Sequence, residues 1–264
     1  MAEVTSVAPP PRWLLFVEGR AFYEMLSTYV SLPLLRCGPE GDGHPVLLFP
    51  GFLASDISTT PLRRFLESQG FSAHRWALGR NLGPRGDFED RMMDRLVELH
   101  ERYQQKVSIV GWSLGGIYAR VLANRAPEIV RSVITLGSPF NHNPRANHSW
   151  RLFEFLSKRP IDEVPDETFR FIRNPPPLPT TAVYSRTDGV AAWPCCRDDE
   201  EGELNENIEV PGSHIGLGVN PLVYHLLLDR LSQPEGEWAP FDRSGLRSFF
   251  YREKSNGQQA PAPA

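Results

Sequence analysis

The sequence predicts an α/β fold in which helices cover both faces of a mainly parallel sheet. Short apolar runs typical of buried strands alternate with longer segments that carry apolar residues at helical spacing. The apolar run at 107–110 leads directly into Gly111-Trp112-Ser113-Leu114-Gly115, and a helical pattern follows. Strands joined through helices in this way pair in parallel and are buried on both faces.

The composition is that of an ordinary globular chain and argues against some function classes. The 264 residues suffice for one large domain, with 41% hydrophobic and 23% charged residues. A formal net charge of -4 gives no basic surface for nucleic acid. We therefore expect a single domain over residues 1–264, with flexible termini at 1–11 and 254–264, and no nucleic-acid partner.

The apolar segments and the cysteines indicate the compartment. No apolar run approaches the roughly 18 residues of a membrane-spanning helix, so no transmembrane segment is expected. The stretch Trp13–Val17 is too short for a signal peptide and is followed by Glu18. Three cysteines (Cys37, Cys195 and Cys196) fit a reducing compartment. We expect a cytoplasmic protein, with loose association to a membrane surface as an open alternative, and we expect Cys195 and Cys196 to be buried thiols rather than a redox pair.

The first element is expected to be a helix from Trp13 to Val30 that Pro33 ends. Its apolar residues share one helical face: Phe22, Met25, Leu26, Tyr29 and Val30. We expect this face to pack on the body of the fold. The alternative is an amphipathic element beside the site mouth that meets lipid.

The next elements continue the alternation of strands and helices. They are expected at His44–Pro50 (strand), Thr59–Gln69 (helix), Phe71–Leu78 (strand) and Asp87–Tyr103 (helix). Asn81 lies in the loop before the last of these, at the functional edge of the sheet. It is a candidate for substrate contact, although a turn role suits asparagine well.

The segment Lys106–Arg120 carries the strongest chemical signal, because it places Ser113 at the apex of a tight strand-turn-helix unit. Glycines are needed two residues before and after this serine, where side chains would collide between strand and helix. The unit resembles the G-x-S-x-G nucleophile elbow of the α/β-hydrolase superfamily. The five-residue pattern occurs by chance in unrelated chains, so the interpretation depends on further parts of the site.

Strands are also expected at Val130–Leu136, Thr181–Tyr184 and Asn207–Val210, before a last helix that opens at Asn220-Pro221. Aromatic clusters and prolines interrupt the alternation at 141–179. In the α/β-hydrolase family an insertion here caps the site, which implies an α/β-hydrolase fold with a small cap. We expect Trp150 and Phe153 to line an apolar substrate site, unless they only pack the insertion onto the body.

The resemblance also implies a catalytic triad in the chain order serine, acid, histidine. That order selects Ser113, Asp188 and His214, each of which follows a predicted strand and so reaches the same sheet edge. A serine hydroxyl needs a base to take its proton, and the base needs an orienting carboxylate. The acidic run Asp198–Glu201 is expected to be a solvated turn.

The family pattern further implies an oxyanion hole built from the backbone N–H groups of Phe52 and Leu114. Phe52 follows Pro50-Gly51, and this proline stands where many members have histidine. Trp112, next to the nucleophile, is expected to contact the substrate.

Within the superfamily, the motifs G-W-S-L-G-G and Y-S-R-T-D-G look most like bacterial esterase/lipase-type hydrolases. This implies a serine carboxylic-ester hydrolase whose substrate is a small or lipid-like apolar ester. Thioester hydrolysis and acyl transfer would use the same residues, and a binding protein on a hydrolase fold is a third alternative. No metal-binding or P-loop spacing is present, so no cofactor is expected.

Overall fold

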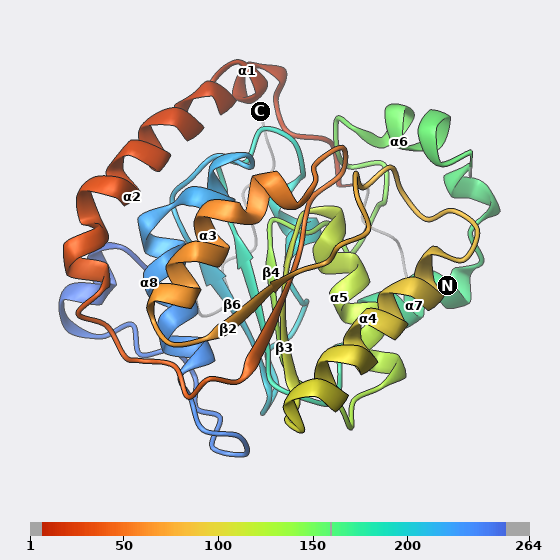
Figure 1. The fold of residues 1–264 in the computed structure, drawn as a ribbon. Coiled ribbons are helices and arrows are strands. Elements are labelled where there is room, and N and C mark those ends of the chain that lie inside the picture. The colour runs from red at the N-terminus through yellow and green to blue at the C-terminus, as the bar shows by residue number, and fades with distance from the viewer. Residues whose placement is uncertain (1–6, 159, 252–264) are drawn as a thin grey trace.

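The computed structural model describes residues 7–158 and 160–251, and at its centre lies a sheet of six parallel strands (Figure 1). The strand order is β2-β1-β3-β4-β5-β6. The all-parallel sheet confirms the predicted fold class. The strands are β1 (Pro45–Phe49), β2 (Ser72–Arg75), β3 (Val107–Trp112), β4 (Val130–Leu136), β5 (Thr180–Tyr184) and β6 (Asn205–Glu209).

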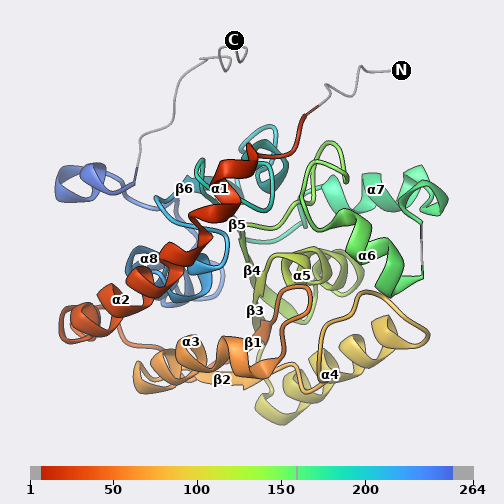
Figure 2. The same ribbon diagram turned by 90° about the horizontal axis from the view of Figure 1, so that it is seen from above.

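Helices cover both faces of this sheet, as Figure 2 shows from above. On one face lie α3 (Asp56–Ser68) and α8 (Pro221–Leu231), and on the other lie α4 (Phe88–Tyr103) and α5 (Leu114–Arg125). Successive strand residues point to opposite faces. Leu48 therefore packs in the core with α3 and α8, and Leu47 packs with α4 and α5. Burial on both faces explains why the strands are continuous apolar runs.

The strand order changes direction at β1, which has β2 on one side and β3 on the other. Connections that leave such a switch point diverge and open a crevice at the carboxyl ends of the strands. The loop after β1 and the turn after β3 meet there. A Cβ atom on Gly51 would lie 3.2 Å from the Cβ of Ser113, so the two segments are nearly in contact.

The insertion at 141–179 contains α6 (Trp150–Ser157), the short helix η2 (Ile161–Glu163) and α7 (Asp166–Arg173). Arg120 of α5 holds α7 by donating to the carbonyls of Ile172 and Arg173. The same guanidinium forms a 2.8 Å ion pair with Asp198, and both side chains are buried. The expectation that Asp198 lies in a solvated turn is therefore wrong.

The amino-terminal segment consists of α1 (Arg12–Phe16), η1 (Glu18–Arg20) and α2 (Ala21–Leu35). The expectation that Pro33 ends the helix is wrong, because a proline in the last turn removes only one helical hydrogen bond. The predicted packing face is also wrong. Its large side chains mostly face solvent, while the buried residues of α2 are Ala21, Thr28 and Leu35.

Three further short helices complete the described part of the chain: η3 (Trp193–Cys196), η4 (Gly216–Val219) and η5 (Gly245–Phe249). The expected flexible segment 254–264 lies outside the described residues, as do residues 1–6 of the expected amino-terminal arm. Within 7–158 and 160–251, no helix combines the length and the apolar character needed to cross a bilayer.

Candidate active site

Ser113 lies at the apex of the turn between β3 and α5 with φ 53° and ψ -123°, a strained conformation for a residue with a side chain. The flanking glycines permit this turn. A Cβ on Gly111 would overlap the backbone of Gly116, and a Cβ on Gly115 would come within 2.5 Å of the Phe49 carbonyl oxygen. The structure therefore shows the close approach of strand and helix that requires glycine at positions 111 and 115.

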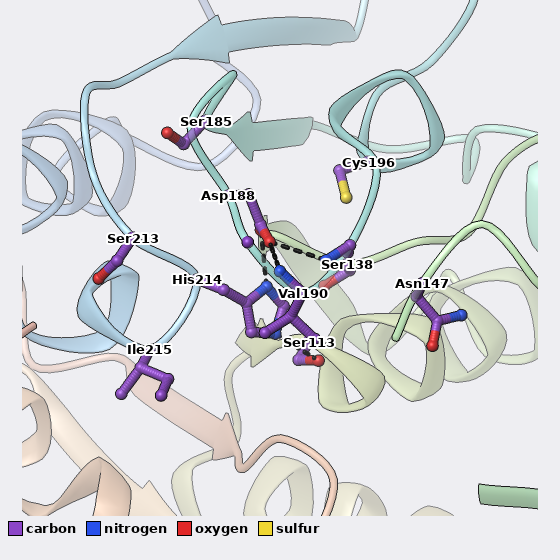
Figure 3. Close-up of polar contacts among 12 residues, drawn as sticks. Ser113, Ser138, Asn147, Ser185, Asp188, Val190, Cys196, Ser213, His214 and Ile215 are labelled. Atoms are coloured by element: carbon purple, nitrogen blue, oxygen red, sulfur yellow. Dashed lines mark hydrogen bonds and ion pairs between the residues drawn. The ribbon is translucent and has the colours of Figure 1, made fainter. Parts of the chain in front are cut away.

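Ser113, His214 and Asp188 lie next to one another at the carboxyl edge of the sheet (Figure 3). The Oγ atom of Ser113 lies 3.0 Å from Nε2 of His214, and Nδ1 of His214 lies 2.6 Å from Oδ2 of Asp188. These side chains come from the loops after β3, β6 and β5. The structure thus brings together residues that are distant in the sequence. Ser113 and Asp188 are more than 70 positions apart.

Asp188 is buried, and its second oxygen is held by the backbone of its own loop. Oδ1 accepts N–H groups from Val190 and Ala191, both at 2.8 Å. Oδ2 is left to face the imidazole of His214 (Figure 3). The loop therefore fixes the carboxylate in the orientation that an acid partner of a histidine base requires.

Two opposing influences act on the imidazole. Burial alone would lower the pKa of His214, but the charge of Asp188 and its hydrogen bond, together with the charge of Glu18, raise that pKa above its ordinary value. The environment therefore favours the protonated imidazole, the form that arises when a base takes the serine proton.

Ser113 opens onto a cavity of about 550 Å³ between the sheet edge and the cap. Phe52 and Leu114, the predicted oxyanion donors, line this cavity beside the serine. Their role as donors stays a prediction. Their position next to Ser113, one after β1 and one at the start of α5, is where charge would develop on an attacked carbonyl.

Residues 141–179, the expected cap, supply about half of the apolar residues that line the cavity. Trp150 and Phe153 of α6 both line it, and their contact with a substrate stays a prediction. The aromatic ring of Phe153 meets that of Phe52 edge to face, with 5.7 Å between the ring centres. Further apolar lining comes from the second half of the cap: Ile161, Val164, Phe169, Phe171 and Ile172.

Two residues that were predicted to contact the substrate, Trp112 and Asn81, lie outside the cavity lining. The indole of Trp112 donates to the carbonyl of His214 at 3.0 Å, and Trp112 is not part of the cavity lining. Asn81 is fully buried and also lies outside the lining. Its amide donates to the Pro50 carbonyl and accepts from the Gly83 N–H, which is the turn role left open for it. Contact of either residue with the substrate stays a prediction, and the structure gives both side chains a structural role.

The two adjacent cysteines are buried and free, and the exposed Cys37 is also free. Burial raises the pKa of the Cys195 thiol to about 11 and that of the Cys196 thiol well above its ordinary value. This confirms the expectation of buried thiols, because reactive cysteines need a lowered pKa.

Sequence reasoning missed Glu18. In the sequence, Glu18 stands out only as a charge that follows a short apolar run. In the structure its carboxylate is buried against the loops that carry Asp188 and His214, and it accepts three backbone N–H groups there. Nothing local in the sequence signals this position, because the donors are more than 170 residues away.

Known proteins resemble part of this sequence or share its fold. A family model described as a PGAP1-like alpha/beta domain matches residues 71–190, which is less than half of the chain. Human serine hydrolase BPHL is 32% identical over 108 residues, which cover 38% of this chain and 37% of the human protein. The chain thus matches well under two thirds of that relative's length.

Solved structures with a similar fold include two lipases. Bacillus licheniformis lipase BlEst2 superposes with a TM-score of 0.54 at 17% identity, covering 74% of this chain and 94% of the lipase. A monoacylglycerol lipase from Paleococcus ferrophilus gives a TM-score of 0.51 at 14% identity, covering 73% and 96%. At these identities the similarity establishes a shared fold.

Proposed function

We propose that this chain, which has an α/β-hydrolase fold, is a serine carboxylic-ester hydrolase of the α/β-hydrolase superfamily that acts on an apolar acyl ester. The observation that carries the proposal is the hydrogen-bonded series Asp188–His214–Ser113, whose serine lines an apolar cavity. In this arrangement the imidazole can take the proton of the alcohol, and the carboxylate stabilises the imidazolium that forms. The alcohol thereby becomes a nucleophile for acyl transfer.

In the acylation step, Nε2 of His214 takes the proton from Ser113 as Oγ attacks the ester carbonyl. The negative charge that develops on the carbonyl oxygen is held by the N–H groups of Phe52 and Leu114. Asp188 keeps Nδ1 protonated and stabilises the imidazolium. The imidazolium then protonates the leaving alcohol, and the acyl group stays on the serine.

In the deacylation step, the neutral His214 takes a proton from water, and the resulting hydroxide attacks the acyl-enzyme. Collapse of the second tetrahedral intermediate breaks the bond to Ser113 Oγ, which recovers its proton from the imidazolium. The released product is the carboxylic acid. Thioester hydrolysis and acyl transfer to another acceptor use the same residues and differ only in the leaving group or in the acceptor.

The aromatic cap supports an apolar acyl group as the part of the substrate that is recognised. Trp150, Phe153 and Phe169 come from different parts of the cap and surround the same cavity. The cavity volume of about 550 Å³ lies in the range of sites that enclose a drug-sized molecule. Part of the chain is similar to human serine hydrolase BPHL, whose name denotes a serine nucleophile, and this supports the assignment of Ser113.

The outer face of α1 and α2 favours the hypothesis that the protein binds its substrate at a lipid surface. Phe16, Val30 and Leu34 are 86%, 75% and 77% exposed, which is unusual for side chains of this size. The exposed aromatic residues Trp13, Phe22, Tyr23 and Tyr29 share the segment, and such residues suit the membrane–water interface. Between Arg20 and Arg36 the only charged residue is Glu24, which is hydrogen-bonded to the body of the fold.

Basic residues border this uncharged face. Arg12 precedes it, Arg36 follows it, and Arg64 lies on the neighbouring α3. All three are exposed, and none has an acidic side chain within 4.0 Å in the part of the chain that the structure describes. An apolar helix face bordered by arginines matches a bilayer surface that contains anionic lipid.

Hydrolysis of chromogenic esters tests the proposed activity. We expect turnover of a p-nitrophenyl series from acetate to palmitate, with loss of nearly all of it in Ser113→Ala. Added thiol or alcohol acceptors would divert the acyl group if transfer is the natural reaction. Stoichiometric ligand binding without turnover by the wild-type protein would contradict the proposal and favour a binding role.

A further inference from the structure

The carboxylate of Glu18 connects the amino-terminal segment to the candidate active site. Glu18 lies in η1 and is only 5% exposed. Its Oε1 atom accepts the N–H of Gly189 at 2.8 Å and the N–H of His214 at 3.0 Å, and Oε2 accepts the N–H of Ile215 at 2.9 Å. A buried carboxylate is costly unless donors surround it, and these three donors satisfy that need.

The donors belong to two different catalytic loops. Gly189 directly follows Asp188 in the loop after β5, whereas His214 and Ile215 lie in the loop after β6. One oxygen atom of Glu18 therefore binds both the residue beside the acid and the base itself. The shared oxygen therefore sets the distance between the backbone of the loop that carries Asp188 and the backbone of the loop that carries His214.

Two more charged side chains of the same segment bind these loops at other points. Arg20 donates to the carbonyls of Thr187 and Gly212, at 2.6 Å and 2.8 Å. Glu24 accepts the N–H of Ser213 at 2.9 Å. The inner face of the segment thus holds both loops, but the contact with His214 itself is made by Glu18.

We propose that Glu18 is a positioning residue for the base: its carboxylate ties the acid loop to the histidine loop so that His214 stays between Asp188 and Ser113. The inference rests on the proposed ester hydrolysis. It assigns to the amino-terminal segment, which lies outside the strand-helix units of the fold, a part in the geometry of the reaction.

Glu18 also acts on the imidazole through its charge. Among the described residues, the charged groups that face His214 are Asp188 and Glu18, and the more distant Arg20 and Glu24 bind the neighbouring backbone. Burial lowers the pKa of His214, while Asp188 and then Glu18 raise it. Removing the charge of Glu18 would therefore lower the pKa of His214 and leave the base active at more acidic pH.

Two substitutions separate geometry from charge. Glu18→Gln leaves one acceptor oxygen and points an amide N–H₂ at a backbone donor, so kcat/KM should fall by about tenfold to a hundredfold, as expected for a displaced base. The acid limb of its pH profile should move to lower pH. Glu18→Asp keeps the charge but is one methylene shorter, so activity should fall while the acid limb stays close to that of the wild type.

Glu24→Gln is the matched control, because Glu24 holds the same loop through Ser213 but does not contact His214. Thermal unfolding of all variants shows how much of any loss is general destabilisation. We expect Glu24→Gln to leave the acid limb in place. An equal shift of the limb in Glu18→Gln and Glu24→Gln, or wild-type kcat/KM in Glu18→Gln, would overturn the proposal.

An NMR titration of His214 keeps this test independent of any substrate. The imidazole should titrate at lower pH in Glu18→Gln than in the wild type, whether or not a given ester is turned over. An unchanged titration in a folded Glu18→Gln protein would overturn the assignment. If the titration shifts as expected but the wild type hydrolyses no ester, the positioning role stands and the proposed function fails.

Discussion

The rings of Phe52 and Phe153, which both line the cavity, meet edge to face with 5.7 Å between their centres. Phe52 belongs to the loop after β1 that is expected to hold the oxyanion, and Phe153 belongs to α6 of the cap. The contact joins the part of the site that would act on the carbonyl to the part that would bind the acyl chain.

Phe153→Ala should therefore affect long acyl chains more than short ones. The substitution removes apolar lining, and contacts of this kind contribute about 1–3 kcal/mol to discrimination. We expect kcat/KM for a long-chain p-nitrophenyl ester to fall by about tenfold or more, with a smaller change for the acetate. Phe155→Ala on the same helix is the control, because Phe155 is exposed and does not line the cavity. An equal effect of both substitutions would contradict the assigned lining.

The raised pKa of His214 predicts where activity is lost in acid. The base must be neutral to take the serine proton, so kcat/KM is lost as the pH falls through the pKa of His214. An ordinary histidine would place this midpoint near about 6.5. Because Asp188 and Glu18 raise the pKa against the effect of burial, we expect the midpoint above that value. A midpoint well below 6.5, measured where the protein is still folded, would contradict this account.

The buried ion pair between Arg120 and Asp198 predicts a large effect on stability. Asp198→Ala would leave the guanidinium of Arg120 buried without a counter-charge, which typically destabilises by about 3–5 kcal/mol. Asp199→Ala is the neighbouring control, because the exposed side chain of Asp199 contacts His142 and accepts from the amide of Asn141, and loss of these contacts should cost about 1 kcal/mol. Urea unfolding measures both. Similar losses for the two variants would show that Arg120 is not held as described.

The exposed face of α1 and α2 predicts binding to lipid vesicles. We expect the wild-type chain to co-sediment with vesicles that contain anionic phospholipid, more than with phosphatidylcholine alone. The double variant Val30→Ser/Leu34→Ser should lose most of this binding, because each large side chain contributes roughly 1.5–3 kcal/mol when its apolar surface is buried. Leu204→Ser is a control with an exposed leucine just before β6, outside α1 and α2.

Two results would contradict the lipid assignment. One is the absence of vesicle binding by the wild type. The other is a dimer in solution that the double variant, but not Leu204→Ser, converts to a monomer, since this would assign the face to a second copy of the chain.

The sequence predicted the parts of the site that are determined locally. Ser113 needs only a strand, a helix and two glycines within a few residues, and these are visible as a pattern. Asp188 and His214 could be selected because parallel strands all end at one edge, so strand exits converge.

Other features depend on contacts between distant segments, and the sequence did not reveal them. The apolar stripe of α2 has helical spacing, but periodicity does not tell which side faces the body. Trp112 is adjacent to the nucleophile, yet its indole turns toward the His214 carbonyl. Glu18 and Asp198 are charged residues that become buried because partners far along the chain satisfy them.

The central claim is that His214 activates Ser113 as the nucleophile, and the most direct measurement is active-site labelling read by mass spectrometry. The folded wild-type protein should take up one fluorophosphonate group, the modified peptide should contain Ser113, and an excess of ester substrate should slow the labelling. Ser113→Ala should not be labelled, and His214→Ala should be labelled far more slowly. Modification of a different residue, or equal labelling rates in the wild type and His214→Ala, would contradict the account.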